Sequence, residues 1–259
     1  MAMLEAKNLN VEYSTKKGTM KAMENVSLDV EEGEFICLLG PSGCGKSTFL
    51  NIVAGFIKPT SGSITLDDCE IKAPGRERGV VFQEHALFPW LTIEQNIRFG
   101  LDVKKMKKSE QEEIITKYLT MMGLTSFRNS FPKELSGGMK QRTAIARALA
   151  NEPRILLMDE PYSALDEQTR RKLQYELSKI WQETKTTIIF ITHSIDEALI
   201  LASKIVVMTP RPGKICKVFD LSKIARPRDE SSETLLEIKQ EITEILKMKS
   251  KEEEESINE

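Results

Sequence analysis

The stretch FICLLGPSGCGKSTFL, residues 35 to 50, runs from an apolar segment through a glycine-rich turn. Its first five residues are apolar on both faces, as in a strand buried inside a parallel sheet. Gly40 to Thr48 then matches G-x-x-x-x-G-K-[ST], and TFLNIVAGF can open as a helix. This motif binds phosphate when it lies between a strand and a helix. The stretch therefore predicts an α/β fold that binds a nucleoside triphosphate.

Each residue type in this turn suits a phosphate ligand. Glycines let backbone N–H groups converge on phosphate, and the helix N-terminus adds positive potential. Lys46 can neutralise the β and γ oxygens, while the hydroxyl of Ser47 can ligate Mg²⁺. We expect the thiolate of Cys44 to be favoured and reactive beside the helix N-terminus. The predicted nucleotide contacts are Gly40, Pro41, Ser42, Gly43, Cys44, Gly45, Lys46, Ser47 and Thr48.

Four further short apolar runs predict the rest of a mostly parallel sheet. They are GVVF (79–82), ILLM (155–158), TIIFI (187–191) and KIVVM (204–208). Long segments with helical signals separate these runs, as parallel strands require. The segments LEAKNLNVEY and VSLDV, near the start of the chain, predict an antiparallel β region instead.

Polar residues follow three of these runs directly: Gln83, the pair Asp159 and Glu160, and His193. Ligands of open α/β sheets bind beyond the carboxyl ends of the strands, so we expect these residues to lie beside the glycine-rich turn. Gln83 and Asp159 suit Mg²⁺, and Glu160 can accept a proton from an attacking water. His193 can hydrogen-bond the γ-phosphate. A lone Gln or His after a strand can equally be an ordinary loop residue.

The remaining segments predict one domain over residues 1–259 with an inserted helical sub-domain at about 90–150. Within the insertion, Ser109 and Glu112 fit a capping box, and Gly123 fits a helix end. A C-terminal helix and charged tail are expected over about 230–259. The helix has one apolar face, and the tail KSKEEEESINE is expected to fray. The expected face consists of Leu235, Ile238, Ile242 and Ile245.

Composition excludes several classes of protein. The net charge of −2 gives no basic field for nucleic acid. No apolar run reaches the ~18 residues of a membrane helix, and the N-terminus lacks a signal-peptide pattern. The four cysteines show no metal spacing and are expected to act as small hydrophobes in a reducing, cytoplasmic compartment.

Six motifs together resemble the ATP-binding-cassette (ABC) ATPases. They are GPSGCGKST, Gln83, LSGGMKQR (135–142), ILLMDEP, SALD (163–166) and His193. The resemblance implies a phosphate-loop ATPase that binds ATP and Mg²⁺ and forms a head-to-tail dimer. It implies that Ser136, Gly137 and Gly138 contact the nucleotide of the partner subunit, with Asp166 at the dimer seam. It also implies that Tyr13 stacks on adenine. Methionine at 139 departs from the glutamine that is usual there.

Further stretches resemble the ATPase subunits of nitrate, sulfonate and taurine importers, notably EHALFPWLTIEQNIRFGL (84–101), MTPRPGKI (208–215) and ARPRD (225–229). The resemblance implies a place at the cytoplasmic face of the membrane, integral permease partners and, indirectly, an external substrate-binding protein. Leu87, Phe88, Pro89 and Trp90 form an apolar loop that can receive a permease helix. These side chains can also serve to fix the sub-domain to the core.

One alternative is a soluble ABC ATPase that acts in assembly or on nucleic acid. The long coiled-coil or zinc insertions of DNA-repair cassettes, and the paired cassettes of translational ones, are missing from this sequence. We therefore expect an importer subunit without a nucleic-acid partner. The transported anion stays open, as does pairing with a related cassette instead of a second copy.

Overall fold

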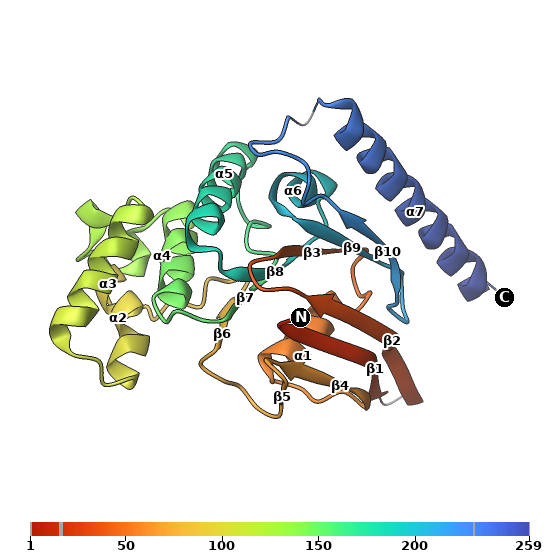
Figure 1. The fold of residues 1–259 in the computed structure, drawn as a ribbon, viewed down its shortest axis with the longest axis horizontal. Coiled ribbons are helices and arrows are strands. Elements are labelled where there is room, and N and C mark those ends of the chain that lie inside the picture. The colour runs from red at the N-terminus through yellow and green to blue at the C-terminus, as the bar shows by residue number, and fades with distance from the viewer. Residues whose placement is uncertain (1, 16–17, 230, 259) are drawn as a thin grey trace. The chain divides into compact units, whose positions relative to one another are not determined.

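The computed structural model of the chain describes residues 2–15, 18–229 and 231–258, with only the backbone of residues 249–258 (Figure 1). These residues form two compact units. The first unit comprises Met1–Gly75 and Thr187–Glu259, and the second comprises Arg76–Thr186. The single-domain organisation predicted from the sequence stays a prediction.

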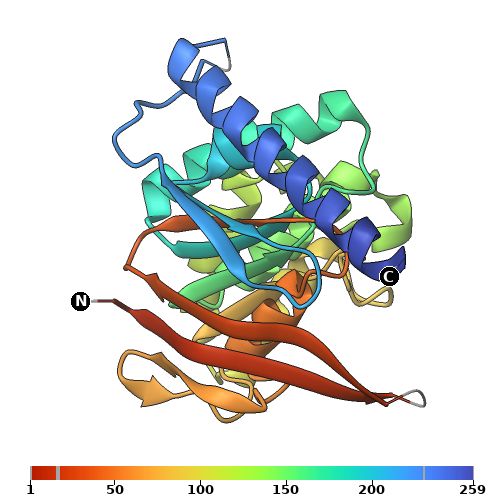
Figure 2. The same ribbon diagram turned by 90° about the vertical axis from the view of Figure 1, so that its right-hand side faces the viewer.

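An antiparallel sheet begins the first unit. Strands β1 (Leu4–Thr15) and β2 (Gly18–Val30) pair antiparallel, and β4 (Ser61–Leu66) pairs antiparallel with the other edge of β1. The short strand β5 (Cys69–Glu70) completes the order β2-β1-β4-β5 (Figure 2). The predicted antiparallel region at the start of the chain is confirmed.

Parallel strands form the core of the same unit. Strand β3 (Phe35–Leu39) is buried along its whole length, and it pairs parallel with β8 (Thr187–Thr192) and β9 (Lys204–Met208). Strand β10 (Ile215–Asp220) adds an antiparallel edge on β9. Two helices leave this sheet: α1 (Lys46–Ala54) after β3 and α6 (Ile195–Leu201) after β8. The predicted α/β class and the apolar runs of these strands are confirmed.

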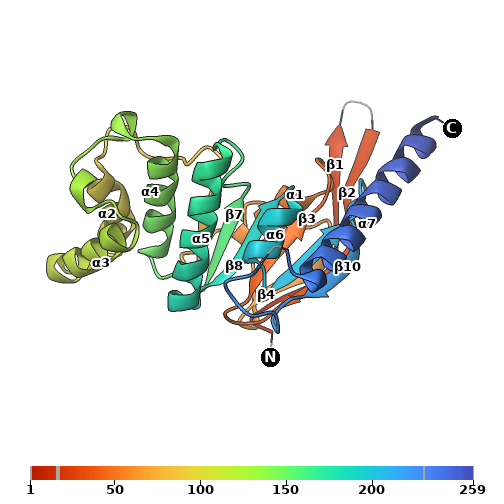
Figure 3. The same ribbon diagram turned by 90° about the horizontal axis from the view of Figure 1, so that it is seen from above.

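The C-terminal helix α7 (Glu233–Asn258) packs on α6 (Figure 3). Leu235 and Ile242 of its predicted apolar face are fully buried, and Lys239 forms an ion pair with Asp196 of α6. The helix continues to Asn258, so the expectation of a frayed tail over residues 249–259 was wrong for 249–258. Regular i, i+4 backbone bonding extends through the acidic run.

The second unit combines two strands with four α-helices. Strands β6 (Arg78–Val81) and β7 (Ile155–Asp159) are parallel. The predicted helical insertion comprises α2 (Ile93–Val103), α3 (Lys108–Met121) and α4 (Gly137–Leu149), which lie together in Figure 3. Two 3₁₀ turns, Thr125–Phe127 and Pro132–Glu134, connect α3 to α4, and α5 (Glu167–Thr184) follows β7.

The predicted capping box at Ser109 and Glu112 was wrong. Helix α3 begins at Lys108, so Ser109 already lies inside the first turn, and the Glu112 carboxylate binds Arg128. A capping box forms instead on α2, where Thr92 accepts from the Gln95 N–H and the Gln95 side chain accepts from the Thr92 N–H. Glu112 therefore pairs with Arg128, which is distant in the sequence, and not with the backbone near Ser109.

The packing of α7 predicts that truncation of two aliphatic side chains of equal size to alanine lowers the free energy of unfolding by different amounts. Ile242→Ala removes a side chain with 0% exposure and should lower the free energy of unfolding by about 2–4 kcal/mol. Leu236→Ala, at a position 50% exposed, should cost less than about 1 kcal/mol. Urea unfolding monitored by circular dichroism measures both. Equal losses in the two variants would show that α7 does not pack on its apolar face.

Candidate nucleotide site

The glycine-rich turn between β3 and α1, residues 40–48, has the backbone of a phosphate cradle. Gly43 and Gly45 both adopt positive φ, at 80° and 96°, a conformation that only glycine takes without strain. A Cβ at Gly45 would lie 2.6 Å from Met23 Cγ and 3.1 Å from the Ala22 carbonyl oxygen of β2. The turn is therefore held against β2 with no room for a side chain.

A second segment presses on this turn, the connection between β9 and β10. A Cβ on Gly213 would lie 1.8 Å from the Cys44 carbonyl oxygen. Gly213 is also bonded to β2, because its N–H donates to Ala22 at 3.0 Å and its carbonyl accepts from Glu24 at 3.0 Å. Sequence reasoning used this connection only for subgroup resemblance and missed its role at the turn. Gly213 was the feature of the sequence that could have indicated a close backbone contact at this point.

Lys46 lies inside the turn with 5% of its surface exposed. Its ammonium donates to the carbonyl oxygens of Gly40 at 2.8 Å and Pro41 at 2.9 Å. A buried ammonium needs such partners because desolvation without them is costly. The positive charge is thus held within the turn by the carbonyls of Gly40 and Pro41.

The expectation of a reactive Cys44 was wrong. The side chain is fully buried, and burial raises the pKa of its thiol although Lys46 acts in the opposite direction. Desolvation outweighs the positive surroundings because the thiol points away from water. The expectation that the cysteines act as small buried hydrophobes is confirmed for Cys37 and Cys44 but not for Cys69 and Cys216, which are exposed.

Two more predicted residues of the first unit can be placed relative to the turn. The hydroxyl of Tyr13 on β1 lies 3.4 Å from Thr48 Oγ1, and the side chain is 37% exposed. His193 directly follows β8, whose last residue, Thr192, is level with Leu39 of β3. His193 is exposed and precedes Ser194, which caps α6. Tyr13 and His193 therefore belong to the same unit as the glycine-rich turn.

The carboxylate pair and Gln83 belong to the second unit. Val81 of β6 is level with Met158 of β7, so Gln83 and Glu160 both follow the carboxyl ends of paired parallel strands. Glu160 has φ 41°, a strained backbone for a residue with a side chain. Gln83 Nε2 donates to Ser163 Oγ at 3.1 Å, and Ser163 Oγ donates to the Glu160 carbonyl at 3.0 Å. Sequence reasoning did not single out Ser163, which lies in SALD.

The signature LSGGMKQR forms the start of α4. Ser136 caps this helix by accepting from the Met139 N–H at 3.3 Å. A Cβ at Gly138 would lie 2.9 Å from Thr169 Cγ2 of α5, so the glycine permits close packing of α4 on α5. Asp166 caps α5, and the Thr169 N–H lowers the pKa of its carboxyl. The signature and the predicted seam residue meet at the starts of these two helices.

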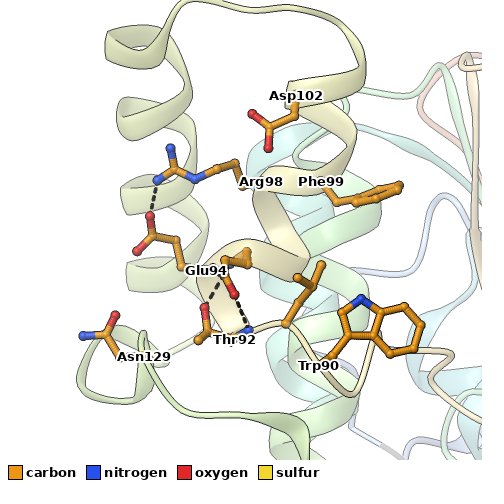
Figure 4. Close-up of a pocket in the computed structure, with 9 residues that line it drawn as sticks. Trp90, Thr92, Glu94, Arg98, Phe99, Asp102 and Asn129 are labelled. Atoms are coloured by element: carbon orange, nitrogen blue, oxygen red, sulfur yellow. Dashed lines mark hydrogen bonds and ion pairs between the residues drawn. The ribbon is translucent and has the colours of Figure 1, made fainter.

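An open cavity of about 550 Å³ lies beside the predicted docking loop. In Figure 4 the rings of Trp90 and Phe99 lie on one side of α2, and the ion pair of Arg98 with Glu94 lies on the other. Trp90 is 70% exposed. The lining residues are Trp90, Leu91, Thr92, Glu94, Gln95, Arg98, Phe99, Asp102 and Asn129. Large exposed aromatics at a cavity are typical of a protein-binding surface.

Comparison with known proteins agrees with this geometry. The family described as ABC transporter matches residues 23–163. A taurine import ATP-binding protein from Pelagibacter ubique is 50% identical over 222 residues, which cover 85% of this chain and 84% of that protein. The chain belongs to the ABC transporter family. The predicted family, fold class and ATPase activity are confirmed.

Two further comparisons support the same assignment. A nitrate import ATP-binding protein from Synechocystis is 46% identical over 212 residues, covering 82% of this ABC ATPase and 80% of that protein. A dimeric, post-hydrolysis ATP-binding cassette bound to ADP and Pi superposes with a TM-score of 0.74 at 36% identity. The match covers 85% of this chain and 99% of that one. Within the described residues, no helix combines the length and apolarity needed to span a membrane.

The residues of the ABC ATPase fit a magnesium nucleotide. The positive-φ glycines and the enclosed Lys46 ammonium form an anion cradle at the start of α1. A serine hydroxyl, an amide oxygen and a carboxylate, from Ser47, Gln83 and Asp159, are the hard oxygen donors that Mg²⁺ prefers. That these three converge on one ion stays a prediction.

Cysteine burial in this ABC ATPase predicts the order of thiol modification. With maleimide near neutral pH, Cys69 and Cys216 should react at least ~10-fold faster than Cys44, whose thiol is buried and has a raised pKa. Peptide mass spectrometry over time gives each rate, and unfolding in urea should make the four rates similar. Labelling of native Cys44 at the rate of Cys69 would contradict the buried placement.

Proposed function

We propose that the chain is the ATP-hydrolysing subunit of an importer for a small anion such as nitrate, sulfonate or taurine. Two copies sandwich two Mg-ATP molecules and drive integral permease subunits at the cytoplasmic face of the membrane. An external substrate-binding protein delivers the anion. The single observation that carries this proposal is that two helices begin with glycines suited to phosphate: α1 follows the glycine-rich turn, and α4 starts with Gly137 and Gly138. One chain with two such turns can serve two nucleotides in a dimer.

The chemistry rests mainly on position and charge. The backbone cradle and Lys46 bind the β- and γ-phosphates, and Tyr13 stacks on adenine. Bound Mg²⁺ neutralises charge on the phosphate oxygens. Glu160 orients the attacking water and accepts its proton, while His193 hydrogen-bonds the γ-phosphate. Glu160 suits this role because it directly follows the carboxyl end of β7, and its positive φ is the kind of backbone strain that is common at active sites.

The second copy completes each site. Ser136, Gly137 and Gly138 lie at the first turn of α4, where N–H groups without a partner inside the helix favour an anion. We assign them to the γ-phosphate bound by the partner subunit, with Asp166 at the seam. Each nucleotide then joins two subunits, so binding closes the dimer and hydrolysis releases it.

The cavity beside Trp90 is the proposed docking site for a permease helix. Trp90 and Phe99 offer apolar surface, and Glu94, Arg98 and Asp102 offer charges around it. An amphipathic helix suits such a groove because its apolar face covers the rings and its flanks meet the charges. The import names of the relatives support a membrane partner for this surface. Leu87, Phe88 and Pro89 belong to the loop that supports it.

Glu160→Gln tests the assignment of the general base. The variant should bind ATP normally, while hydrolysis should fall about 10²–10⁴-fold, the span typical of a general base. That loss corresponds to about 2.7–5.4 kcal/mol of barrier. Phosphate release measures hydrolysis, and size exclusion with MgATP should show accumulation of a dimer. Turnover within a factor of three of the parent would remove Glu160 from the mechanism.

A mixture of two inactive variants tests action across the dimer. Lys46→Ala damages the phosphate cradle of its own subunit, and Ser136→Arg damages the signature lent to the other. In a mixed dimer, one site joins both lesions and the other joins an intact cradle to an intact signature. The mixture alone should therefore form an ATP-dependent dimer with one occluded nucleotide.

The two variants carry different tags, so that exchange of subunits between dimers can be confirmed. The measured quantity is the amount of mixed dimer captured with ATP, and not the rate of hydrolysis. Because Ser136 also caps α4, unfolding of Ser136→Arg must first be compared with that of the parent. Ser136→Ala, which loses the cap without adding bulk, is the matched control. Confirmed subunit exchange without an ATP-dependent mixed dimer would show that the signature acts within its own subunit.

A further inference from the structure

The loop before α2, Glu84–Thr92, has a backbone that its own sequence does not favour; we call it the docking segment. His85 and Ala86 are consecutive residues with positive φ, at 57° and 46°. This left-handed conformation is unfavourable for residues with a side chain, at about 1–2 kcal/mol each. Two such residues in succession persist only where surrounding groups stabilise them. The contacts of the docking segment show which groups do so.

Arg147, near the end of α4, binds the two strained residues. Its guanidinium donates to the Ala86 carbonyl at 2.6 Å and to the His85 carbonyl at 3.2 Å. The same guanidinium lies 5.5 Å from the ring centre of Phe88, a cation–π contact. The planar guanidinium presents its donors in a fixed fork and stacks on a ring face, whereas an ammonium is a point charge on a flexible stem. Burial lowers the pKa of Arg147, yet the side chain has no carboxylate among these partners.

Asn96 of α2 also binds the segment. Its Oδ1 accepts from the Phe88 N–H at 2.9 Å, and its Nδ2 donates to the carbonyls of Phe88 at 3.2 Å and Leu91 at 3.0 Å. Asn96 is fully buried, so these bonds satisfy an amide that has no access to water. Phe88 is thus held by both Arg147 and Asn96.

These contacts reach the cavity directly. The Phe88 ring lies 4.6 Å from that of Phe99 and 5.8 Å from that of Trp90, centre to centre. Phe99 and Trp90 line the cavity in Figure 4. Arg147 and Asn96 therefore set the position of the aromatic surface without lining the cavity themselves.

We propose that Arg147 and Asn96 are positioning residues that fix the docking segment to α4 and to α2 respectively, so that the signature, at the start of α4, and the docking surface move together. Ser136 caps the same helix roughly 16 Å from Arg147, at ~1.5 Å per residue. A shift of the signature on nucleotide binding would reach the cavity through one helix. Transmission of a shift from the signature to the cavity rests on the proposed function. The attachment of the docking segment to α4 rests only on contacts within the second unit.

Hydrogen exchange of the full-length protein tests the attachment without a partner. The amides of His85, Ala86, Phe88 and Leu91 all donate hydrogen bonds and should exchange slowly. Arg147→Lys should accelerate exchange in peptides covering 84–92 at least ~10-fold and leave α3 and α5 within twofold. Arg142→Lys is the matched control, because Arg142 lies on the same helix but pairs with Glu176 and the Met122 carbonyl. Unchanged exchange at 84–92 in Arg147→Lys would overturn the proposal.

A second variant covers the case in which Arg147→Lys unfolds. Gln141 of α4 is fully buried, and its Oε1 contacts His85 Nδ1 while its Nε2 has no hydrogen-bond partner among the described residues. Gln141→Leu removes the contact with His85 and also an unsatisfied buried group. It should therefore loosen 84–92 without lowering the unfolding midpoint. Loosening that occurs only together with a lower midpoint would indicate a structural role alone.

Transmission from the signature to the docking segment is measured by hydrogen exchange in the Glu160→Gln variant, with and without MgATP. Residues 136–139 and 84–92 should both change exchange when nucleotide is added. Adding Arg147→Lys should keep the response at 136–139 and abolish it at 84–92. An identical response at 84–92 with and without Arg147→Lys would overturn transmission through α4. No response at 136–139 in the Glu160→Gln parent would instead count against the proposed dimer, and the attachment would be judged from the nucleotide-free rates.

Discussion

The close approach of Gly213 to the Cys44 carbonyl is the constraint on which the first unit depends. Any Cβ on Gly213 would lie 1.8 Å from that oxygen, so the contact admits only glycine and ties the β9–β10 connection to the glycine-rich turn. The same glycine bonds to Ala22 and Glu24 of β2. The antiparallel sheet, the parallel sheet and the cradle thereby share one junction. A cradle built this way is set before any ligand binds, which lowers the entropy cost of binding phosphate.

The second unit shows how one residue serves both the fold and the site. Ser136 and Asp166 cap α4 and α5, and Gly138 lets the two helix starts approach within van der Waals distance. Caps leave the remaining N–H groups of the first turn pointing outward, which is also what an anion site requires. Substitutions at these positions therefore combine losses of stability and of activity. Separating the two needs unfolding measurements on each variant.

Sequence patterns were sufficient wherever the deciding interactions are local. The five apolar runs became strands to within about one residue, and the motif at 40–48 formed the expected turn, because strand burial and glycine conformation are short-range properties. Contacts between residues far apart in the sequence could not be predicted from sequence patterns. Arg147 binding to His85, Glu112 binding to Arg128, and Gly213 pressing on Cys44 each join segments with no common pattern. Cys44 was misjudged for the same reason, since its burial arises from tertiary packing.

Three partly buried arginines share a feature that bears on how the fold responds to pH. Arg226 and Arg228 donate to carbonyl oxygens at the end of α6, as Arg147 does in the docking segment. Burial lowers the pKa of Arg228 to about 10, so it stays charged at neutral pH. A carbonyl cannot take up a proton in the physiological range. These attachments should therefore not depend on pH between about 5 and 8.

The ion pairs around Glu94, unlike these arginine–carbonyl bonds, should depend on pH. Its carboxylate accepts from Arg128 and Arg98, and the bond from Arg128 lowers the pKa of Glu94. A carboxyl with a lowered pKa stabilises the fold above its unfolded pKa of about 4.3, and that contribution is lost as the pH falls through the folded value. Acid should thus loosen the α2–α3 side of the docking cavity first. The bonds from Arg147 should persist, because they end on the backbone carbonyls of His85 and Ala86, which do not titrate.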